Sequence, residues 1–119
     1  MRDDPERLQD ILKAIDQILA KTQSARNSFD SDEMLQVWVL HHLQIIGEAA
    51  RCLTEPFRQR HPDRVWSKSA GLRHILVHHY FAIDADLVWK VVENDLPELR
   101  RIVTSILLRE PEAPGEGNS

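Results

Sequence analysis

Apolar residues recur at intervals of three and four along most of this chain, which is the spacing of one face of an α-helix. The clearest run lies near the start and comprises Leu8, Ile11, Leu12, Ile15, Ile18 and Leu19. We expect Asp4 to cap this first helix and Pro5 to occupy its first turn. The polar stretch of residues 22–31 interrupts the pattern and predicts a connection with a turn around Phe29.

Three further helices are expected. The second should begin near Ser31 or Asp32 and run to about Leu53. Its apolar positions cover more than one face, so it should lie centrally or also face a partner. Residues 54–67 contain two prolines and predict a short helical turn and a loop, after which a third helix should run from about Ser67 to residues 79–81.

The fourth helix should begin after Asp84, a favourable capping residue. Pro97 lies inside its apolar pattern and removes a backbone donor, so the helix should kink or restart at Asp95, where the carboxylate can cap. Residues 110–119 are rich in Pro, Gly and Glu and predict a flexible acidic tail. The strict alternation of a β-strand is absent from the sequence, so residues 1–109 predict one all-α domain, a four-helix bundle.

Length and composition exclude several classes of protein. A chain of 119 residues fits one domain, and its single cysteine, Cys52, excludes an internal disulfide framework and a zinc site made of cysteines. We expect that thiol to be buried and inert. The opening residues are too charged for a signal peptide, and the sequence lacks an apolar run long enough for a membrane span. We therefore expect a cytoplasmic protein.

Charge is distributed unevenly along the chain. The net charge is −4, yet residues 51–80 carry six basic and two acidic side chains, a local charge of +4. Four of the six histidines also fall in this segment. Such a patch on an acidic body favours one site for an anionic ligand, although an ordinary solvated face has the same composition.

The densest group of chemically useful residues lies in residues 71–84, GLRHILVHHYFAID. Arg73 is a permanent cation that can stabilise a phosphorane, and His78 can exchange a proton near neutral pH. Together they suffice for RNA cleavage in which the ribose 2′-OH attacks the adjacent phosphate without a metal. A surface ion pair for Arg73 and a packed core position for His78 remain the ordinary alternatives.

Histidine spacing also allows a metal site. His74 and His78 are four residues apart on one predicted helix, Glu48 or Asp84 can add a carboxylate, and His41 and His42 add nitrogen ligands. The sequence lacks an HExxH motif, and such pairs arise by chance in a chain with six histidines, so we favour the reading without a metal.

The motif and several flanking segments resemble one known family. Arg73, His78 and Tyr80 spell R-x4-H-x-Y, the motif of the HepT-like toxins of the HEPN superfamily. Similar segments occur in the same order at residues 1–15, QIIGEAA at 44–50, HPDRVW at 61–66 and DLVWKVVENDLPELR at 86–100. The resemblance covers about residues 1–108. It departs at His74, because family members usually carry Asn or Asp directly after the motif arginine.

This resemblance implies a metal-independent endoribonuclease without a cofactor, in which Arg73 and His78 act on RNA. It implies a homodimer whose two motif helices line one cleft, and the toxin half of a toxin–antitoxin pair. The partner would be a nucleotidyltransferase (MNT-type) antitoxin that transfers AMP to Tyr80, in a larger complex with the dimer.

The remaining candidates are supporting residues or a different class of protein. Glu48, on the second helix, is a candidate for orienting Arg73 across the bundle. Asp84 is a second candidate, because it lies on nearly the same side of the motif helix as Arg73 if that helix continues to residue 84. The alternative function is a HEPN-fold dimer with weak or no catalysis that serves as a protein- or nucleotide-binding module, which His74 favours slightly.

Overall fold

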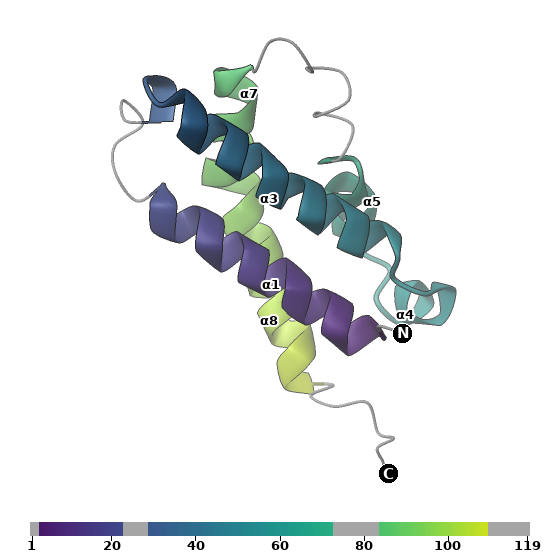
Figure 1. The fold of residues 1–119 in the computed structure, drawn as a ribbon. Coiled ribbons are helices and arrows are strands. Elements are labelled where there is room, and N and C mark those ends of the chain that lie inside the picture. The colour runs from purple at the N-terminus through teal and green to yellow at the C-terminus, as the bar shows by residue number, and fades with distance from the viewer. Residues whose placement is uncertain (1–2, 23–28, 73–83, 110–119) are drawn as a thin grey trace.

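The chain folds as an all-α protein, as predicted (Figure 1). The computed structural model describes residues 3–22, 29–72 and 84–109. Within these ranges regular structure is entirely helical, in the elements α1 (Asp4–Lys21), α3 (Glu33–Arg51), α4 (Glu55–Arg60), α5 (Val65–Ala70), α7 (Ala85–Lys90), the π-helical turn η1 (Val91–Asp95) and α8 (Leu96–Arg109). The predicted tail at 110–119 lies outside the described residues.

The first helix begins one residue earlier than its sequence pattern indicated. Asp3, and not Asp4, is the N-cap, because its side chain accepts a hydrogen bond from the Glu6 backbone N–H at 3.0 Å. The Glu6 carboxylate accepts in return from the Asp3 N–H, which completes a capping box. Asp4 is thereby released for a tertiary contact, since its carboxylate accepts hydrogen bonds from the backbone N–H and the hydroxyl of Thr54 at 3.0 and 2.6 Å.

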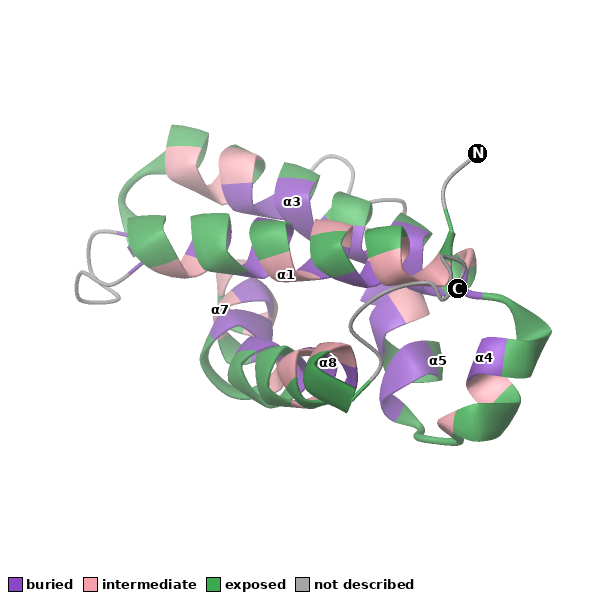
Figure 2. Cartoon of the chain, turned by 90° about the horizontal axis from the view of Figure 1, so that it is seen from below, coloured by how far each residue is buried: buried purple, intermediate pink, exposed green. Residues whose placement is uncertain are grey.

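The core lies where α1, α3 and α8 meet. In Figure 1, α1 and α3 run side by side in opposite directions, and α8 crosses beneath them. Figure 2 shows that the buried residues of α1 and α8 lie on the sides that face each other, while the exposed ones lie outside. The fully buried side chains include Ile11, Ile15 and Ile18 of α1, Leu43 and Ile46 of α3, and Leu99 and Val103 of α8.

Helix α3 is central, as predicted, because it packs against both α1 and α5. It begins after the N-cap Asp32 and ends at Arg51, close to the predicted bounds. It also leaves an apolar stripe uncovered, with exposed fractions of 83% for Met34, 53% for Val37 and 37% for Ile45. The second apolar face that the sequence predicted for this helix therefore includes residues that look outward.

The segment between α3 and the predicted third helix is more ordered than the expected turn and loop. It contains two short helices, α4 and α5, and α5 begins at Val65, two residues before the predicted start. Each contributes a large aromatic side chain to the core, Phe57 and Trp66. Their rings meet edge to face, with centroids 5.4 Å apart.

The last helical segment continues through its proline. Asp84 caps α7, as predicted, by accepting from the Leu87 N–H at 3.1 Å. A kink or a restart was predicted at Asp95; the α-helix is interrupted there by the π-helical turn η1, which leads directly into α8 without a cap from Asp95. A π-turn shifts the register of the backbone bonds, which accommodates a residue without an N–H. Asp95 pairs with Lys68 (N–O distance 2.9 Å), so its carboxylate has a tertiary partner.

Phe29 contributes to the core from the connection before α3. It is buried, and its ring lies 5.3 Å from that of Trp89 on α7. Among the described helices, none combines the length and the apolar character that a membrane crossing requires.

Phe57→Ala should lower the free energy of unfolding by about 3–5 kcal/mol, because a ring that is 1% exposed is removed from a packed site. Chemical denaturation followed by circular dichroism measures this loss. Leu108→Ala is the matched control, since its side chain is 78% exposed, and it should change stability little. Equal losses for the two variants would contradict the packing described here.

Candidate functional site

The predicted catalytic motif begins at the edge of the described structure. Arg73, His74, His78 and Tyr80 lie outside the described residues, as does the expected end of the third helix. The structure does describe the residues on either side. Leu72 is buried directly before Arg73, and Asp84 caps α7 directly after the segment.

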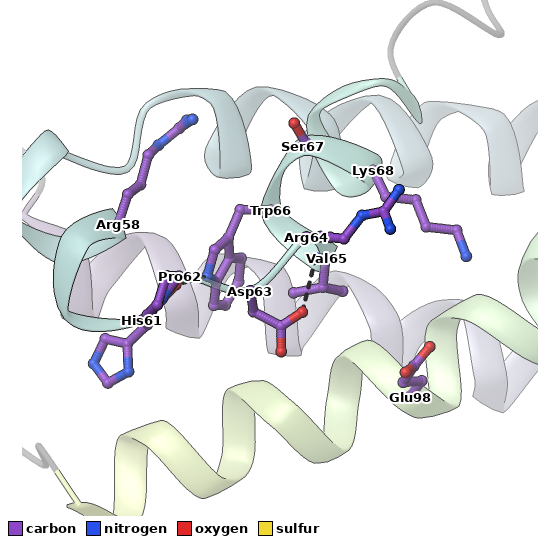
Figure 3. Close-up of a pocket in the computed structure, with 10 residues that line it drawn as sticks. All are labelled: Arg58, His61, Pro62, Asp63, Arg64, Val65, Trp66, Ser67, Lys68 and Glu98. Carbon is purple, nitrogen blue, oxygen red and sulfur yellow. Dashed lines mark hydrogen bonds between the residues drawn. The ribbon is translucent and has the colours of Figure 1, made fainter.

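The loop that leads to the motif is held by aromatic packing and by two side-chain hydrogen bonds. The indole N–H of Trp66 donates to the carbonyl oxygen of His61 at 2.9 Å, and the His61 ring lies 4.7 Å from that of Phe57. Asp63 accepts a hydrogen bond from the Val65 N–H at 3.0 Å (Figure 3). These contacts give HPDRVW, one of the segments that carried the family resemblance, a structural role as the start of α5.

Arg58 has a structural role at the end of α3. Its guanidinium donates to the carbonyl oxygens of Ala50, Arg51 and Leu53 at 2.9, 3.1 and 3.2 Å. These carbonyls belong to the last turn of α3 and the residues after it, where helix geometry leaves acceptors without partners. One of the six cations of the predicted basic patch is thus committed to helix capping.

Two further cations of the patch pair with carboxylates. Arg51 pairs with Glu48, which lies one turn earlier in α3, and Lys68 pairs with Asp95. Asp95 raises the pKa of the Lys68 ammonium by accepting its hydrogen bond and by its negative charge. The charge count over residues 51–80 therefore overstates the number of cations that are free of carboxylate partners.

Glu48 is exposed on α3 and lines a shallow groove of about 500 Å³ with Arg7 and Asp10 of α1 and with His41. Cys52 lies 3.7 Å from the Glu48 carboxylate and 3.6 Å from the Arg51 guanidinium. The thiol is half-buried, so the expectation of a buried Cys52 is wrong: the helix ends there and leaves the residue at the surface. The expected contact of Glu48 with Arg73 involves a residue outside the described part of the chain.

His42 belongs to the core. Its Nδ1 lies 2.8 Å from the Trp38 carbonyl oxygen, and its ring stacks on that of Trp38 with centroids 4.1 Å apart. It is buried, whereas His41 is exposed. In residues 3–22, 29–72 and 84–109, His, Cys, Asp and Glu do not gather in groups of three or more that could hold a metal ion. The alternative site at His74 and His78 lies outside these ranges.

The tertiary structure gathers a second set of cations around the loop of residues 61–63. On one side, a pocket of about 860 Å³ is lined by Arg58, His61, Arg64, Lys68 and Glu98 among others (Figure 3). On the other side, a pocket of about 370 Å³ is lined by Arg60, Arg101, Ser105 and Arg109 among others. Both pockets share residues 61–63 and both are bordered by α8, so they adjoin at the α4–α5 loop; together they are called the groove between this loop and α8.

Sequence analysis missed the contribution of α8 to this groove. Arg101, Ser105 and Arg109 are spaced by four residues and lie on one face of α8, a pattern that is visible in the sequence. They lie near Arg60 and His61, in a segment some forty residues away along the chain. Helical periodicity relates residues within one helix, so it does not predict this proximity.

Comparison with known proteins agrees with the motif. The family model described as Ribonuclease HepT-like matches residues 11–106. A protein of Methanocaldococcus jannaschii named "Putative RNase" is 38% identical over 97 residues, which cover 81% of this chain and 89% of that protein. "Probable ribonuclease HepT" of Thermococcus cleftensis is 36% identical over 94 residues, covering 78% of this chain and 86% of that protein.

A search of solved structures finds no significant match. The family match spans both the helices that frame the motif and the motif itself, and the relatives align along most of their length. The all-α fold and these matches lead to one conclusion: the chain belongs to the HepT-like ribonuclease family.

Proposed function

We propose that this protein is a metal-independent endoribonuclease that cleaves RNA through Arg73 and His78. The observation that carries the proposal is the family match over residues 11–106, which encloses the complete R-x4-H-x-Y motif. The described structure supports it through α5, which leads from the anchored HPDRVW loop to Leu72, directly before Arg73.

The proposed reaction is a transesterification. The ribose 2′-oxygen forms a bond to the neighbouring phosphorus, and the bond from phosphorus to the 5′-oxygen of the next nucleotide breaks. His78 moves the protons, taking one from the 2′-OH or giving one to the leaving 5′-oxygen, and Arg73 stabilises the additional negative charge on the phosphorane. The products are a 2′,3′-cyclic phosphate and a 5′-hydroxyl.

We further propose that the protein is the toxin of a toxin–antitoxin pair. A nucleotidyltransferase antitoxin would transfer AMP from ATP to the hydroxyl of Tyr80, with release of pyrophosphate. The AMP phosphate would pair with Arg73 and occupy the position that the RNA backbone requires, so the modification inhibits by charge and by volume.

A homodimer completes the proposal, and α3 supplies a surface for it. Met34, Val37 and Ile45 lie within one face of α3 and are exposed. An apolar stripe of this kind on a small domain is suited to a symmetric contact between two copies. In such a dimer the two copies of Arg73 and His78 would share one RNA strand.

Arg73→Ala and His78→Ala should each lower the rate of RNA cleavage by about 10²-fold or more, because each removes a group that acts in the transition state. Cleavage by the parent should persist in EDTA and leave 2′,3′-cyclic phosphate ends, read by gel electrophoresis and mass spectrometry. Full activity of His78→Ala would reject its assignment. Loss of activity in EDTA with recovery in zinc or manganese would favour the metal site at His74 and His78. Absence of cleavage by the parent would favour the binding-module alternative.

Tyr80→Phe should still cleave RNA but escape neutralisation by the antitoxin, because the acceptor hydroxyl is gone. Mass spectrometry after co-expression of the parent with a nucleotidyltransferase antitoxin should find additions of about 329 Da on the peptide that holds Tyr80. Neutralisation of Tyr80→Phe to the same extent as the parent would place the switch elsewhere.

Val37→Glu and Ile45→Glu should convert a dimer into monomers, because each introduces a charge into the proposed apolar contact. Sedimentation at micromolar concentration should give about twice the 13.8 kDa chain mass for the parent and one chain mass for the variants. Gln17→Glu, on an exposed position of α1, adds the same charge and should leave the dimer intact. A monomeric parent would contradict the proposed dimer.

A further inference from the structure

The groove between the α4–α5 loop and α8 has the character of a binding surface for a polyanion. Its two parts are lined by six Lys or Arg side chains and two carboxylates, Asp63 and Glu98, a local charge of +4 in a chain whose net charge is −4. A concentration of one sign on a body of the opposite sign attracts anions to that place.

Three of these cations have no counterion within the described part of the chain. Arg64, Arg101 and Arg109 are exposed and form no ion pair there. Elsewhere the same structure pairs Arg51 with Glu48 and Arg100 with Asp16. The groove therefore holds guanidinium groups that are available to an external anion, in a protein with 19 acidic side chains.

The geometry of α8 arranges these groups in a row. Arg101, Ser105 and Arg109 follow one another at intervals of four residues, which places them about 6 Å apart along the helix axis. Guanidinium and hydroxyl groups donate hydrogen bonds to phosphate oxygens. A row of donors with this step suits successive phosphates of an extended strand better than a single small anion.

The opposite wall of the groove is rigid. The His61 carbonyl is held by Trp66, the His61 ring lies against Phe57, and Arg60 lies over the Phe57 ring at 5.9 Å. The same loop begins α5, which ends at Ala70, three residues before Arg73 in the sequence. The groove thus lies at the start of the segment that leads to the motif along the chain.

We infer that this groove binds the phosphate backbone of the RNA substrate, with Arg64, Arg101 and Arg109 as the phosphate contacts. The inference rests on the proposed ribonuclease function, and it adds a second place at which RNA contacts the protein. The groove contacts phosphates, so it contributes to the affinity and the orientation of the RNA but does not recognise the base sequence. The three arginines are positioning residues that bind the backbone and take no part in bond breaking.

The first test measures RNA binding in the His78→Ala background, in which cleavage should be slowed by about 10²-fold or more. The probe is a fluorescein-labelled single-stranded RNA of mixed sequence, titrated at several salt concentrations. The triple variant Arg64→Gln, Arg101→Gln, Arg109→Gln should bind more weakly, and its slope of log K against log salt should become shallower by about 2, since each contact to a single strand contributes about 0.7.

Arg100→Gln and Arg101→Gln form a matched pair. The two residues are neighbours on α8, carry the same charge and are both exposed, but Arg100 pairs with Asp16 on α1 whereas Arg101 lines the groove. Arg101→Gln should weaken binding and reduce the salt slope by about 0.7, while Arg100→Gln should leave both unchanged. Equal effects of the two variants would show that only total charge matters and would overturn the inference.

The second test separates this inference from the proposed function. With catalytic His78 restored, the triple variant should cleave a dinucleotide at the parent rate and a long RNA with a lower kcat/KM, because a dinucleotide does not reach the groove. A triple variant that binds and cleaves long RNA like the parent overturns the groove and leaves the ribonuclease intact. A parent that cleaves neither RNA overturns the ribonuclease, while the binding titration still tests the groove.

A different occupant would also be visible. If the triple variant keeps its RNA affinity but loses binding to poly-glutamate, the groove recognises acidic polypeptide and the inference is wrong. Circular dichroism melting of the triple variant should match the parent, because all three side chains are exposed.

Discussion

The guanidinium of Arg58 determines how the chain turns from the long helices toward the functional segment. The last turn of α3 leaves carbonyl oxygens without helical partners, and the chain continues with Cys52, Leu53 and Thr54 in place of the glycine that often closes a helix. Arg58 reaches back from α4 and donates to three of these carbonyls. Hydrogen bonds to a charged group are worth about 1.5–3 kcal/mol each, and the cation also meets the negative end of the helix dipole.

The contacts that follow depend on this turn. With α4 folded back, Thr54 contacts Asp4. This contact links the end of α3 to the start of α1. Phe57 then reaches Trp66, whose indole holds the His61 carbonyl and starts α5. The position of α5 decides where the chain enters the motif at residue 73.

The cations of this protein divide by what the tertiary structure places beside them. Arg51, Lys68 and Arg100 meet carboxylates and contribute to the surface of the fold. Arg64 and Arg101, from separate segments, converge on one groove without such partners in the described residues. Counting charge along residues 51–80 treats all basic residues alike, so it identified a basic region correctly but not which of its members lack a carboxylate partner.

What the sequence determined by itself is local: helical periodicity placed α1, α3 and the last helix, and Asp84 was identifiable as a cap because a cap bonds within three residues. The R-x4-H-x-Y motif, with its flanking segments, was enough for the family that the comparison then confirmed. The tertiary structure alone decided that Asp4 binds Thr54 instead of capping, that Asp95 pairs with Lys68, and that Arg101 faces the HPDRVW loop. The physical reason is distance along the chain: caps and periodicity arise from neighbours within one or two helical turns, whereas these partners meet only after the helices have packed.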